Sequence, residues 1–523
     1  MITFLLAMEA SMLKCFISPL LAICLLFIDH AVAQEAQVAE KAEVLPKNTP
    51  QEESIISSHS VQIGNSNIAY QAKVGTQLLN DEQGNPKASI FYVAYTKENS
   101  GERKNRPITF CFNGGPGSAS VWLHLGVLGP KRVAMDEQGK VAAQPYHLID
   151  NAYSILDLSD LVFIDPVSTG FSRAIPGEEA KNFHGVEKDI KSVAEFIRLY
   201  ITRNERWESP KFLAGESYGT TRASGLALEL HNKHHLYLDG LVLISSVLNF
   251  QTIRFAAGND LPYILYLPTY CATAMYHNKL DDELQADKKK TLAEVEKFSL
   301  GEYAEALMYG THLSNDKREA VLDKLERYTG ISKDYLDRSD LRLHIFRFAK
   351  ELLRNERRTV GRFDSRLKGI DSDLCADTFE FDPSFENIVG AFTATFNNYI
   401  RSDLNWKHDA EYKIIADVQP WDYGIANNQY LDVGDSLREV MSKNTSLDVF
   451  VASGNYDLAT PYFATEYTFS HLGLDPSLRD HVTLKTYEGG HMMYLYFPSL
   501  VKLKTDLSSF MDERLEKRKL EKS

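Results

Sequence analysis

A serine flanked by glycines is the first feature of this chain that could do chemistry. Gly215-Glu216-Ser217-Tyr218-Gly219 follows a short apolar run at residues 212–214 and precedes a segment with helical character at residues 221–234. A strand, a sharp turn and a helix in this order form a nucleophile elbow, whose small flanking residues let the serine oxygen stand above the sheet edge. An ordinary strand-to-helix turn has the same pattern, so the interpretation of Ser217 as a nucleophile depends on its partners.

A nucleophilic serine needs a base to take its proton and a carboxylate to hold the base in the correct tautomer. After an elbow of this kind, the acid and then the base follow along the chain, each on a loop after a late strand. Asp457 fits the acid, because it ends a turn directly after the apolar run at residues 449–452. His491 fits the base, since two glycines precede it after the strand-like residues 482–486. The competitors are less well placed relative to the strands: Asp448, His471 and His481.

A tetrahedral intermediate also needs backbone N–H donors for its oxyanion. Asn113-Gly114-Gly115-Pro116-Gly117 directly follows the apolar run at residues 108–112. This is the position at which α/β-hydrolases build one half of the oxyanion hole. The N–H of Gly115 could act there with that of Tyr218, although a plain glycine turn explains the same residues. The glycines lack the Gly-Lys-Ser/Thr ending of a phosphate-binding loop.

Short apolar runs alternate with helical stretches over the first half of the chain, which is typical of parallel strands with crossover helices. Two earlier segments, 67–72 and 88–95, flank a turn and predict an antiparallel opening to the sheet. We therefore predict an α/β-hydrolase fold with a mixed, mostly parallel central sheet and helices on both faces. The strands are expected at 108–112, 161–164, 212–214 and 241–244, with a helix at 185–203.

The alternation stops near residue 250, and residues 281–362 are charged with apolar positions at helical spacing. This pattern predicts an inserted, mainly helical cap domain. Strand signals return at 447–452 and 482–486, and a helix begins near Leu500. The predicted organisation is a signal peptide at 1–33, a disordered leader at 34–58, the hydrolase domain at 59–250 and 431–515, the cap at 251–430 and a charged tail at 516–523.

Charge and the N-terminal residues predict where the protein acts. A formal net charge of −14 argues against nucleic acid and anionic membranes as partners, because either would need a basic surface. Lys14, an apolar run at 16–28 and Ala31-Val32-Ala33 have the three parts of a secretory signal peptide. The run is short for a membrane span. We expect cleavage after Ala33, no membrane anchor and an exported protein, periplasmic or extracellular.

Cysteines and histidines give weaker signals. Cys111 lies in an apolar run and is expected as a buried thiol, whereas Cys271 and Cys375 could form one disulfide in an oxidising compartment. Three histidines at helical spacing lack an accompanying carboxylate and fit a surface cluster better than a metal site. They are His231, His234 and His235.

Four blocks resemble the signature blocks of the serine carboxypeptidase family, peptidase family S10. Their order and spacing match over about residues 65 to 510, whereas the segment from about 250 to 430 is much less recognisable and resembles a bacterial branch. The blocks are Asn113-Gly114-Gly115-Pro116-Gly117-Ser118, Asp165-Pro166-Val167-Ser168-Thr169-Gly170-Phe171-Ser172, Gly215-Glu216-Ser217-Tyr218-Gly219 and Gly490-His491-Met492.

The resemblance implies roles for the residues of these blocks. In the family, a serine, an aspartate and a histidine form the triad, two backbone N–H groups form the oxyanion hole, and an asparagine and a glutamate bind the peptide's terminal carboxylate. A carboxylate can bind beside a glutamate only if one of the two acids is protonated, so such recognition favours acidic pH. The matching residues are Ser217, Asp457 and His491 for the triad, Gly115 and Tyr218 for the hole, and Asn113 and Glu216 for the carboxylate.

Two positions depart from the family pattern. Val127 stands where members commonly carry a glutamate that pairs with the glutamate beside the nucleophile, and Ser118 replaces a disulfide-forming cysteine. The resemblance implies a serine-type carboxypeptidase that acts on peptides with a free C-terminus and needs no cofactor, and the N-terminal signal pattern adds export. An esterase, amidase or acyltransferase with the same triad is the alternative that Val127 favours. A catalytically silent protein that binds partners through the cap is a further alternative.

Overall fold

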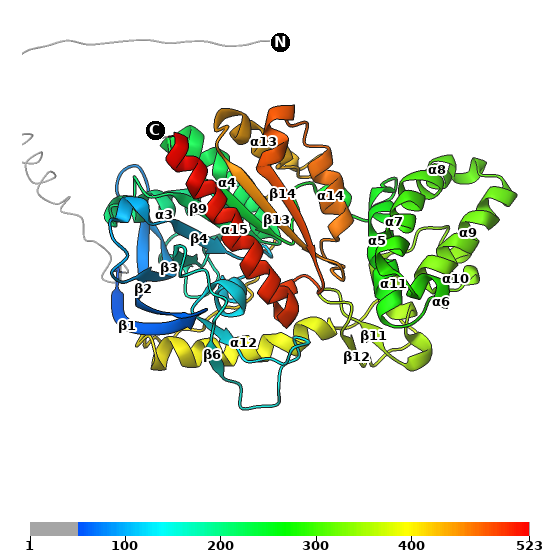
Figure 1. Ribbon diagram of the computed structural model, residues 1–523, viewed down its shortest axis with the longest axis horizontal. Helices are drawn as coiled ribbons and strands as arrows, with labels where there is room; N and C mark the ends of the chain where they lie inside the picture. Colours follow the sequence, from blue (N-terminus) through cyan, green and yellow to red (C-terminus); the bar gives the residue numbers. More distant parts are fainter. Residues whose placement is uncertain (1–50, 522–523) are drawn as a thin grey trace, which may run out of the picture. The chain divides into compact units, whose positions relative to one another are not determined.

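The computed structural model describes residues 51–521 (Figure 1), so the predicted signal peptide and most of the predicted leader lie outside the described residues. A ten-stranded sheet organises this part of the chain. Its strands are β1 (Ser54–Ile63), β2 (Ser66–Asn80), β3 (Pro86–Lys97), β4 (Ile108–Phe112), β7 (Asp160–Ile164), β8 (Arg173–Ala174), β9 (Lys211–Glu216), β10 (Gly240–Ile244), β13 (Asp448–Gly454) and β14 (Val482–Tyr487).

The strand order is β1-β2-β3-β7-β4-β9-β10-β13-β14, with β8 beside β3. Strands β1, β2 and β3 pair antiparallel, and β3 also pairs antiparallel with β7. From β7 to β14 every neighbouring pair is parallel. Every residue of β4, β7, β9, β10 and β13 is buried, as expected for parallel strands covered on both faces. The predicted α/β-hydrolase fold is confirmed.

Helices cover both faces of the sheet. On one face α3, α4 and α13 share a hydrophobic cluster with the strands, and on the other face α12 and α15 share a second cluster. Figure 1 shows α15 running diagonally across the sheet. The bounds are α3 (Val186–Arg203), α4 (Tyr218–His234), α12 (Pro383–Ser402), α13 (Gly434–Lys443), α14 (Tyr462–Ser470) and α15 (Phe497–Glu521), with a short α2 (Val121–Leu123).

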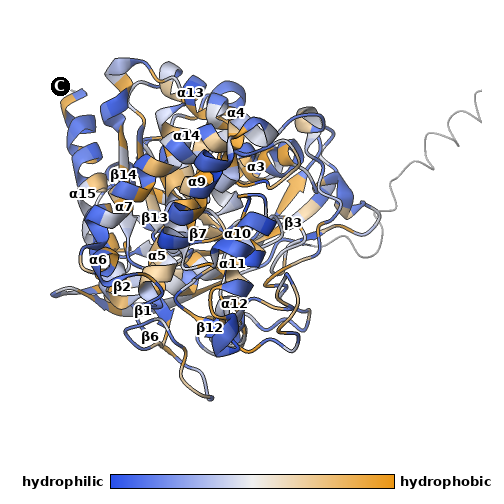
Figure 2. Ribbon diagram, turned by 90° about the vertical axis from the view of Figure 1, so that its right-hand side faces the viewer, coloured by the Kyte–Doolittle hydropathy of each residue, from blue (hydrophilic) through white to orange (hydrophobic). Residues whose placement is uncertain are grey.

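The helical insertion has a hydrophobic core of its own, which runs from Tyr266 to Val360 and also takes in Leu458. In Figure 2 the ribbons of α9 and α10 are largely hydrophilic in colour, because charged residues are frequent in both helices. The helices of the insertion are α5 (Leu261–Tyr276), α6 (Asp282–Gln285), α7 (Lys288–Phe298), α8 (Ala304–Tyr309), α9 (Asn315–Thr329), α10 (Lys333–Arg338) and α11 (Ile345–Glu351).

The rest of the segment predicted as cap, residues 251–430, packs differently from these helices. The buried residues of α12, such as Phe392 and Phe396, belong to the core beneath the sheet. Ile414 and Ala416 form backbone hydrogen bonds with Ala119 and Gly117. The apolar face of α12 therefore covers the hydrolase sheet. Two small ladders complete the fold, β5 (Lys131–Val133) with β6 (Leu148–Asp150) and β11 (Thr359–Val360) with β12 (Lys368–Gly369).

Both ends of the described chain are more ordered than the sequence predicted. Strand β1 begins at Ser54, within the segment 34–58 that we expected to be disordered, because it pairs with β2 over ten residues. Helix α15 continues to Glu521 through the predicted tail at 516–523. Arg518 forms an ion pair with Asp239, which anchors this end of the helix. Charge composition alone did not reveal these pairings.

Two further findings concern thiols and membrane spans. Cys111 is buried, as expected for a residue of β4. Cys271 is a buried free thiol in the core of the insertion and Cys375 is an exposed free thiol, so the disulfide that we considered between them is not formed. Within residues 51–521, no helix combines the length and apolar character that crossing a membrane requires.

Candidate active site

Ser217 occupies a strained turn between β9 and α4. Its φ of 60° and ψ of −130° place a non-glycine residue in a region that favours glycine, as in a nucleophile elbow. The two flanking positions must be glycine, because a Cβ at either one would lie too close to a backbone oxygen. A Cβ on Gly215 would lie 2.2 Å from the Gly219 oxygen, and one on Gly219 would lie 2.9 Å from the Phe112 oxygen. The Gly-x-Ser-x-Gly pattern therefore has a direct steric cause.

Asp457 and His491 lie in contact on loops after β13 and β14. The Nδ1 of His491 is 2.7 Å from Oδ2 of Asp457, and both side chains are buried. Oδ1 of Asp457 accepts hydrogen bonds from the N–H groups of Ala459 (2.7 Å) and Thr460 (3.0 Å). The Thr460 hydroxyl donates to Oδ2 at 2.7 Å. Four hydrogen-bond contacts thus fix the Asp457 carboxylate, which can hold the His491 imidazole in one orientation.

The electrostatics of His491 follow from this contact. Burial acts to lower the pKa of His491, but the charge of Asp457 and its hydrogen bond together outweigh burial, so the pKa is raised. A raised pKa means that the site stabilises the imidazolium. A general base that takes a proton from a serine becomes this imidazolium, so the arrangement suits proton transfer at Nε2.

Ser217 and His491 line one cavity of about 110 Å³ at the carboxyl ends of the strands. In α/β sheets ligands bind at this edge. Asn113, Gly115 and Glu216 line the same cavity, whereas Asp457 lies behind His491. The remaining wall contains apolar side chains and one arginine: Trp122, Phe363, Phe385, Ile415, Met492 and Arg362.

The glycine loop after β4 packs directly on the start of α4. A Cβ on Gly114 would lie 2.4 Å from the Tyr218 nitrogen, and Gly115 has a φ of 103°. Neither the Gly115 N–H nor the Tyr218 N–H has a hydrogen-bond partner in residues 51–521. Arg222 of α4 donates to the Asn113 oxygen at 2.6 Å and pairs with buried Asp189, which holds the loop in place. Two free donors therefore lie close together beside Ser217.

Glu216 is a buried acid that lines this cavity. Burial raises its pKa to about 7, although His491 and a hydrogen bond from Tyr494 act in the opposite direction. The Tyr494 hydroxyl donates to Oε2 of Glu216 at 2.6 Å. The Nδ2 of Asn113 is buried and makes no hydrogen bond of ordinary geometry within the described chain, while its Oδ1 accepts from the Leu123 N–H. The pair thus offers an unused amide donor and an acid that is partly protonated near neutral pH.

Sequence motifs did not identify three residues of this neighbourhood. Tyr494 contacts Glu216, and Arg362 lines the cavity with His491, only through the folding of distant segments. Thr460 contacts Asp457 within one loop. Tyr494 lies three residues after His491, and Thr460 three after Asp457. Proximity to predicted site residues was the one available signal for those two, and Arg362 had none.

The competing residues lie elsewhere. His481 pairs with Asp448 at 2.6 Å beside the start of β13, and exposed His471 contacts the Tyr467 oxygen. His231, His234 and His235 lie at the end of α4. Within residues 51–521, no group of three or more His, Cys, Asp or Glu side chains is arranged to hold a metal ion.

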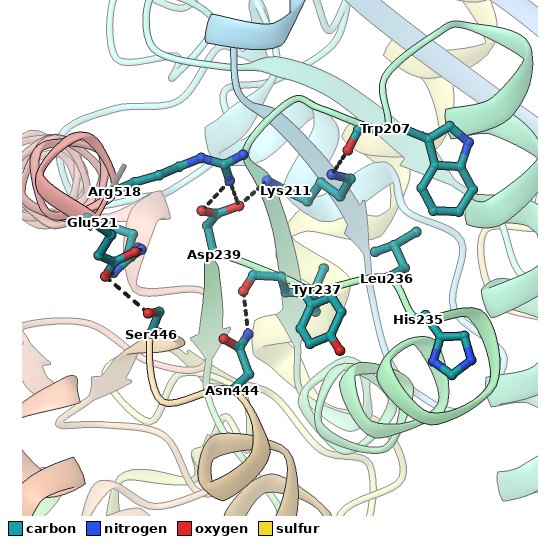
Figure 3. A pocket seen from close by; sticks show the side chains of 12 residues that line it. Trp207, Lys211, His235, Leu236, Tyr237, Asp239, Asn444, Ser446, Arg518 and Glu521 are labelled. Carbon is teal, nitrogen blue, oxygen red and sulfur yellow. Dashed lines mark hydrogen bonds and ion pairs between the residues drawn. The ribbon is translucent and has the colours of Figure 1, made fainter. Parts of the chain in front are cut away.

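A second cavity lies at the opposite edge of the sheet (Figure 3). Lys211 and Asp239 both line this cavity. Lys211 begins β9 and Asp239 precedes β10, so the cavity lies at the amino ends of these strands. Burial lowers the pKa of Lys211 to about 8, and its ammonium donates to backbone oxygens of Trp207 and Ser209. Asp239 pairs with Arg518 of α15. The polar groups of this cavity are therefore engaged with one another, and the ion pair of Asp239 with Arg518 attaches α15 to the edge of the sheet.

The fold and the elbow at Ser217 define this chain as an α/β-hydrolase. The family model described as serine carboxypeptidase matches residues 78–485. The chain therefore belongs to the serine carboxypeptidase family, as its motifs predicted, and that family is one of serine-type carboxypeptidases.

Named relatives are distant. Carboxypeptidase Y homolog A of Uncinocarpus reesii is 26% identical over 206 residues, which are 39% of this chain and 33% of the relative. The pheromone-processing carboxypeptidase KEX1 of Saccharomyces cerevisiae is 33% identical over 145 residues, 26% of this chain and 18% of the relative. The matched segments thus span a third or less of these relatives.

One solved structure extends the comparison over the whole fold. The crystal structure of Kex1, a prohormone-processing carboxypeptidase from Saccharomyces cerevisiae, covers 91% of this chain and 93% of its own, with a TM-score of 0.51 and 18% identity. At this identity the likeness shows the shared fold.

Proposed function

We propose that this protein is an exported serine-type carboxypeptidase that hydrolyses the C-terminal peptide bond through an acyl-enzyme. The observation that carries the proposal is the arrangement of Ser217 and His491 on one cavity, with His491 bound to Asp457 at 2.7 Å. Family membership supports the same reaction. The substrate is a peptide with a free C-terminus, and the chemistry uses no cofactor.

The proposed reaction begins when Ser217 attacks the scissile carbonyl and His491 takes the serine proton. Asp457 orients His491 and stabilises its charged form. The free N–H groups of Gly115 and Tyr218 then stabilise the oxyanion. His491 returns the proton to the leaving amine, and water, activated by the same histidine, hydrolyses the acyl-enzyme.

The proposed selection for a terminal carboxylate relies on Asn113 and Glu216. The unused Nδ2 of Asn113 can donate to a carboxylate oxygen. Glu216 can donate only when protonated, and its pKa of about 7 keeps it partly protonated near neutral pH. Tyr494 hydrogen-bonds Glu216 in a chain where Val127 replaces the family's second acid. We therefore expect binding of the substrate carboxylate to weaken as the pH rises through about 7, where Glu216 loses its proton.

The alternative function is that of an esterase, amidase or acyltransferase with the same triad. Val127 is the observation that favours it, because the acid pair is incomplete. A fluorophosphonate probe tests the shared machinery: we expect covalent labelling at Ser217, found by mass spectrometry of peptides, and none in Ser217→Ala. Labelling that persists in the variant would contradict both enzymes and support a silent binding protein.

Export and lineage remain part of the proposal. The charged, apolar and small-residue regions of residues 1–33 support a signal peptide, and so a periplasmic or extracellular location. N-terminal sequencing of the secreted protein should begin at Gln34, and retention of the first 33 residues would contradict export by this route. The bacterial branch is supported by the divergent insertion alone, since the relatives described above are fungal.

A further inference from the structure

We propose that Arg362 binds a carboxylate of the substrate beside the scissile bond. This inference rests on the proposed function of the same cavity and adds to it a specificity-determining residue that no motif marked. Arg362 follows β11, on the segment that joins the helical insertion to α12. Its side chain lines the cavity with Ser217 and His491.

Arg362 is an arginine without a counter-charge. Its Nε is buried and has no hydrogen-bond partner, and its guanidinium forms no ion pair in residues 51–521. Its one side-chain contact of note is with the Phe363 ring, at 5.3 Å from the ring centroid. Among the described residues that line the cavity, it is the only lysine or arginine. Buried polar groups normally have partners, so this guanidinium is available to a ligand.

The nearby carboxylates are already engaged. Oδ1 and Oδ2 of Asp382 accept from the backbone N–H groups of Arg362 and Phe363, each at 3.1 Å. Asp382 also caps α12 through the Ser384 N–H at 2.9 Å. Asp364 pairs with Arg366 at 2.6 Å. The segment thus places two arginines near each other, of which one is neutralised and the other, Arg362, faces the catalytic cavity.

Backbone contacts fix this segment to both catalytic loops. The Arg362 oxygen accepts from the Leu458 N–H at 3.0 Å, next to Asp457. The Phe363 oxygen accepts from the His491 N–H at 2.5 Å, and the two rings lie 5.0 Å apart. Arg362 is also close enough to His491 to act against the rise in its pKa. The backbone that carries Arg362 is therefore fixed beside the catalytic loops before substrate arrives, which reduces the ordering cost of binding.

A half-buried, unpaired guanidinium binds carboxylates well, because its planar donors match two carboxylate oxygens. A guanidinium donates hydrogen bonds and cannot accept them, so its attraction for a carboxylate does not depend on the protonation of Glu216. Two substrate groups carry this chemistry next to the bond: the terminal carboxylate, and the side chain of an aspartate or glutamate at either flanking position. The apolar wall of the cavity would contact the rest of the peptide.

Pairs of blocked dipeptides distinguish these two groups. The first pair is a free acid and its C-terminal amide, and the others carry glutamate or glutamine at one flanking position. Each is assayed for kcat/KM with wild type, Arg362→Gln, Arg362→Lys and the control Arg357→Gln. Arg357 is exposed and lies five residues upstream, so its change removes the same charge outside the cavity.

We expect Arg362→Gln to lose about ten- to hundredfold in kcat/KM on the carboxylate member of one pair, with little change on its neutral partner. Arg362→Lys should recover part of this loss, and Arg357→Gln should resemble wild type. Loss in the acid and amide pair identifies the terminal carboxylate, and loss in a glutamate and glutamine pair identifies the side chain. Fluorophosphonate labelling of Ser217 in each variant reports that the site is folded.

The results separate this inference from the proposed function. If wild type prefers the free acid and Arg362→Gln keeps every preference, or loses activity equally on all substrates, the inference is overturned and the carboxypeptidase proposal stands. If wild type ignores the terminal carboxylate but prefers glutamate through Arg362, the carboxypeptidase proposal fails and the inference stands.

Discussion

Tyr494 donates a hydrogen bond of 2.6 Å to Oε2 of Glu216, and so joins the loop of His491 to the turn that carries Ser217. Gly126 makes room for the tyrosine, since a Cβ there would lie 2.5 Å from Cε2 of its ring. Val127, the next residue, stands where the family resemblance leads us to expect a second acid. A hydroxyl thus supplies a hydrogen bond to Glu216 without adding another ionisable carboxylate to the cavity.

Removal of this hydroxyl should change the pH profile. In Tyr494→Phe the ionised form of Glu216 loses a donor, so its pKa should rise above about 7. Because protonated Glu216 is proposed to bind the substrate carboxylate, the alkaline limb of kcat/KM on a free-acid dipeptide should move up by about one unit. Tyr496→Phe, two residues away with its ring against Arg366, is the matched control. An alkaline limb that stays in place would exclude Glu216 as its source.

Burial of Glu216 should also be visible in stability. Its pKa is about 7 in the folded protein against 4.5 for an exposed glutamate, so the folded state holds the proton more tightly. Stability from this group is therefore greatest below pH 4.5 and falls as the pH rises to about 7. Glu216→Gln does not titrate, and its free energy of unfolding relative to wild type should rise by up to about 3 kcal/mol between pH 4.5 and 8.

Urea unfolding at the two pH values measures this difference. Glu305→Gln, a change of an exposed glutamate of α8, is the control and should show a much smaller dependence on pH. If wild type and Glu216→Gln keep the same stability difference at both pH values, Glu216 does not have a raised pKa.

Thr460 should matter for rate through Asp457. Its hydroxyl donates to Oδ2 of Asp457, the same oxygen that contacts His491. Thr460→Val keeps the shape and removes this bond to a charged group, so we expect kcat to fall about tenfold or more on an ester substrate. Thr465→Val removes a hydroxyl that donates to the Ser246 oxygen at 3.2 Å and should leave kcat nearly unchanged. Equal effects of the two changes would assign Thr460 a purely structural role.

Local patterns sufficed for the parts of the fold whose causes are local. The strand ending at Phe112 and the elbow at Ser217 could be predicted because burial and steric contact act over a few residues. The order of Asp457 and His491 after the elbow followed from the topology of parallel strands. The contact of Tyr494 with Glu216 could not be predicted, since 278 residues separate them along the chain.

The packing of the helical segment at residues 251–430 could not be predicted from local patterns. Helical spacing at residues 281–362 led us to predict a mainly helical cap at 251–430, but such spacing does not say which surface a helix covers. Helix α12 packs beneath the sheet through Phe392 and Phe396, whereas α5 to α11 enclose their own core. Arg362 lies between these two parts, so its place in the cavity depends on packing that no single segment encodes.

The most direct test of the account is release of an amino acid from a blocked dipeptide with a free C-terminus, compared with its C-terminal amide, from pH 4 to 8. Wild type and Ser217→Ala are assayed side by side. We predict selective cleavage of the free acid, declining above about pH 7 as Glu216 ionises, and no cleavage by Ser217→Ala. Equal cleavage of acid and amide, or turnover of esters alone, would contradict a carboxypeptidase.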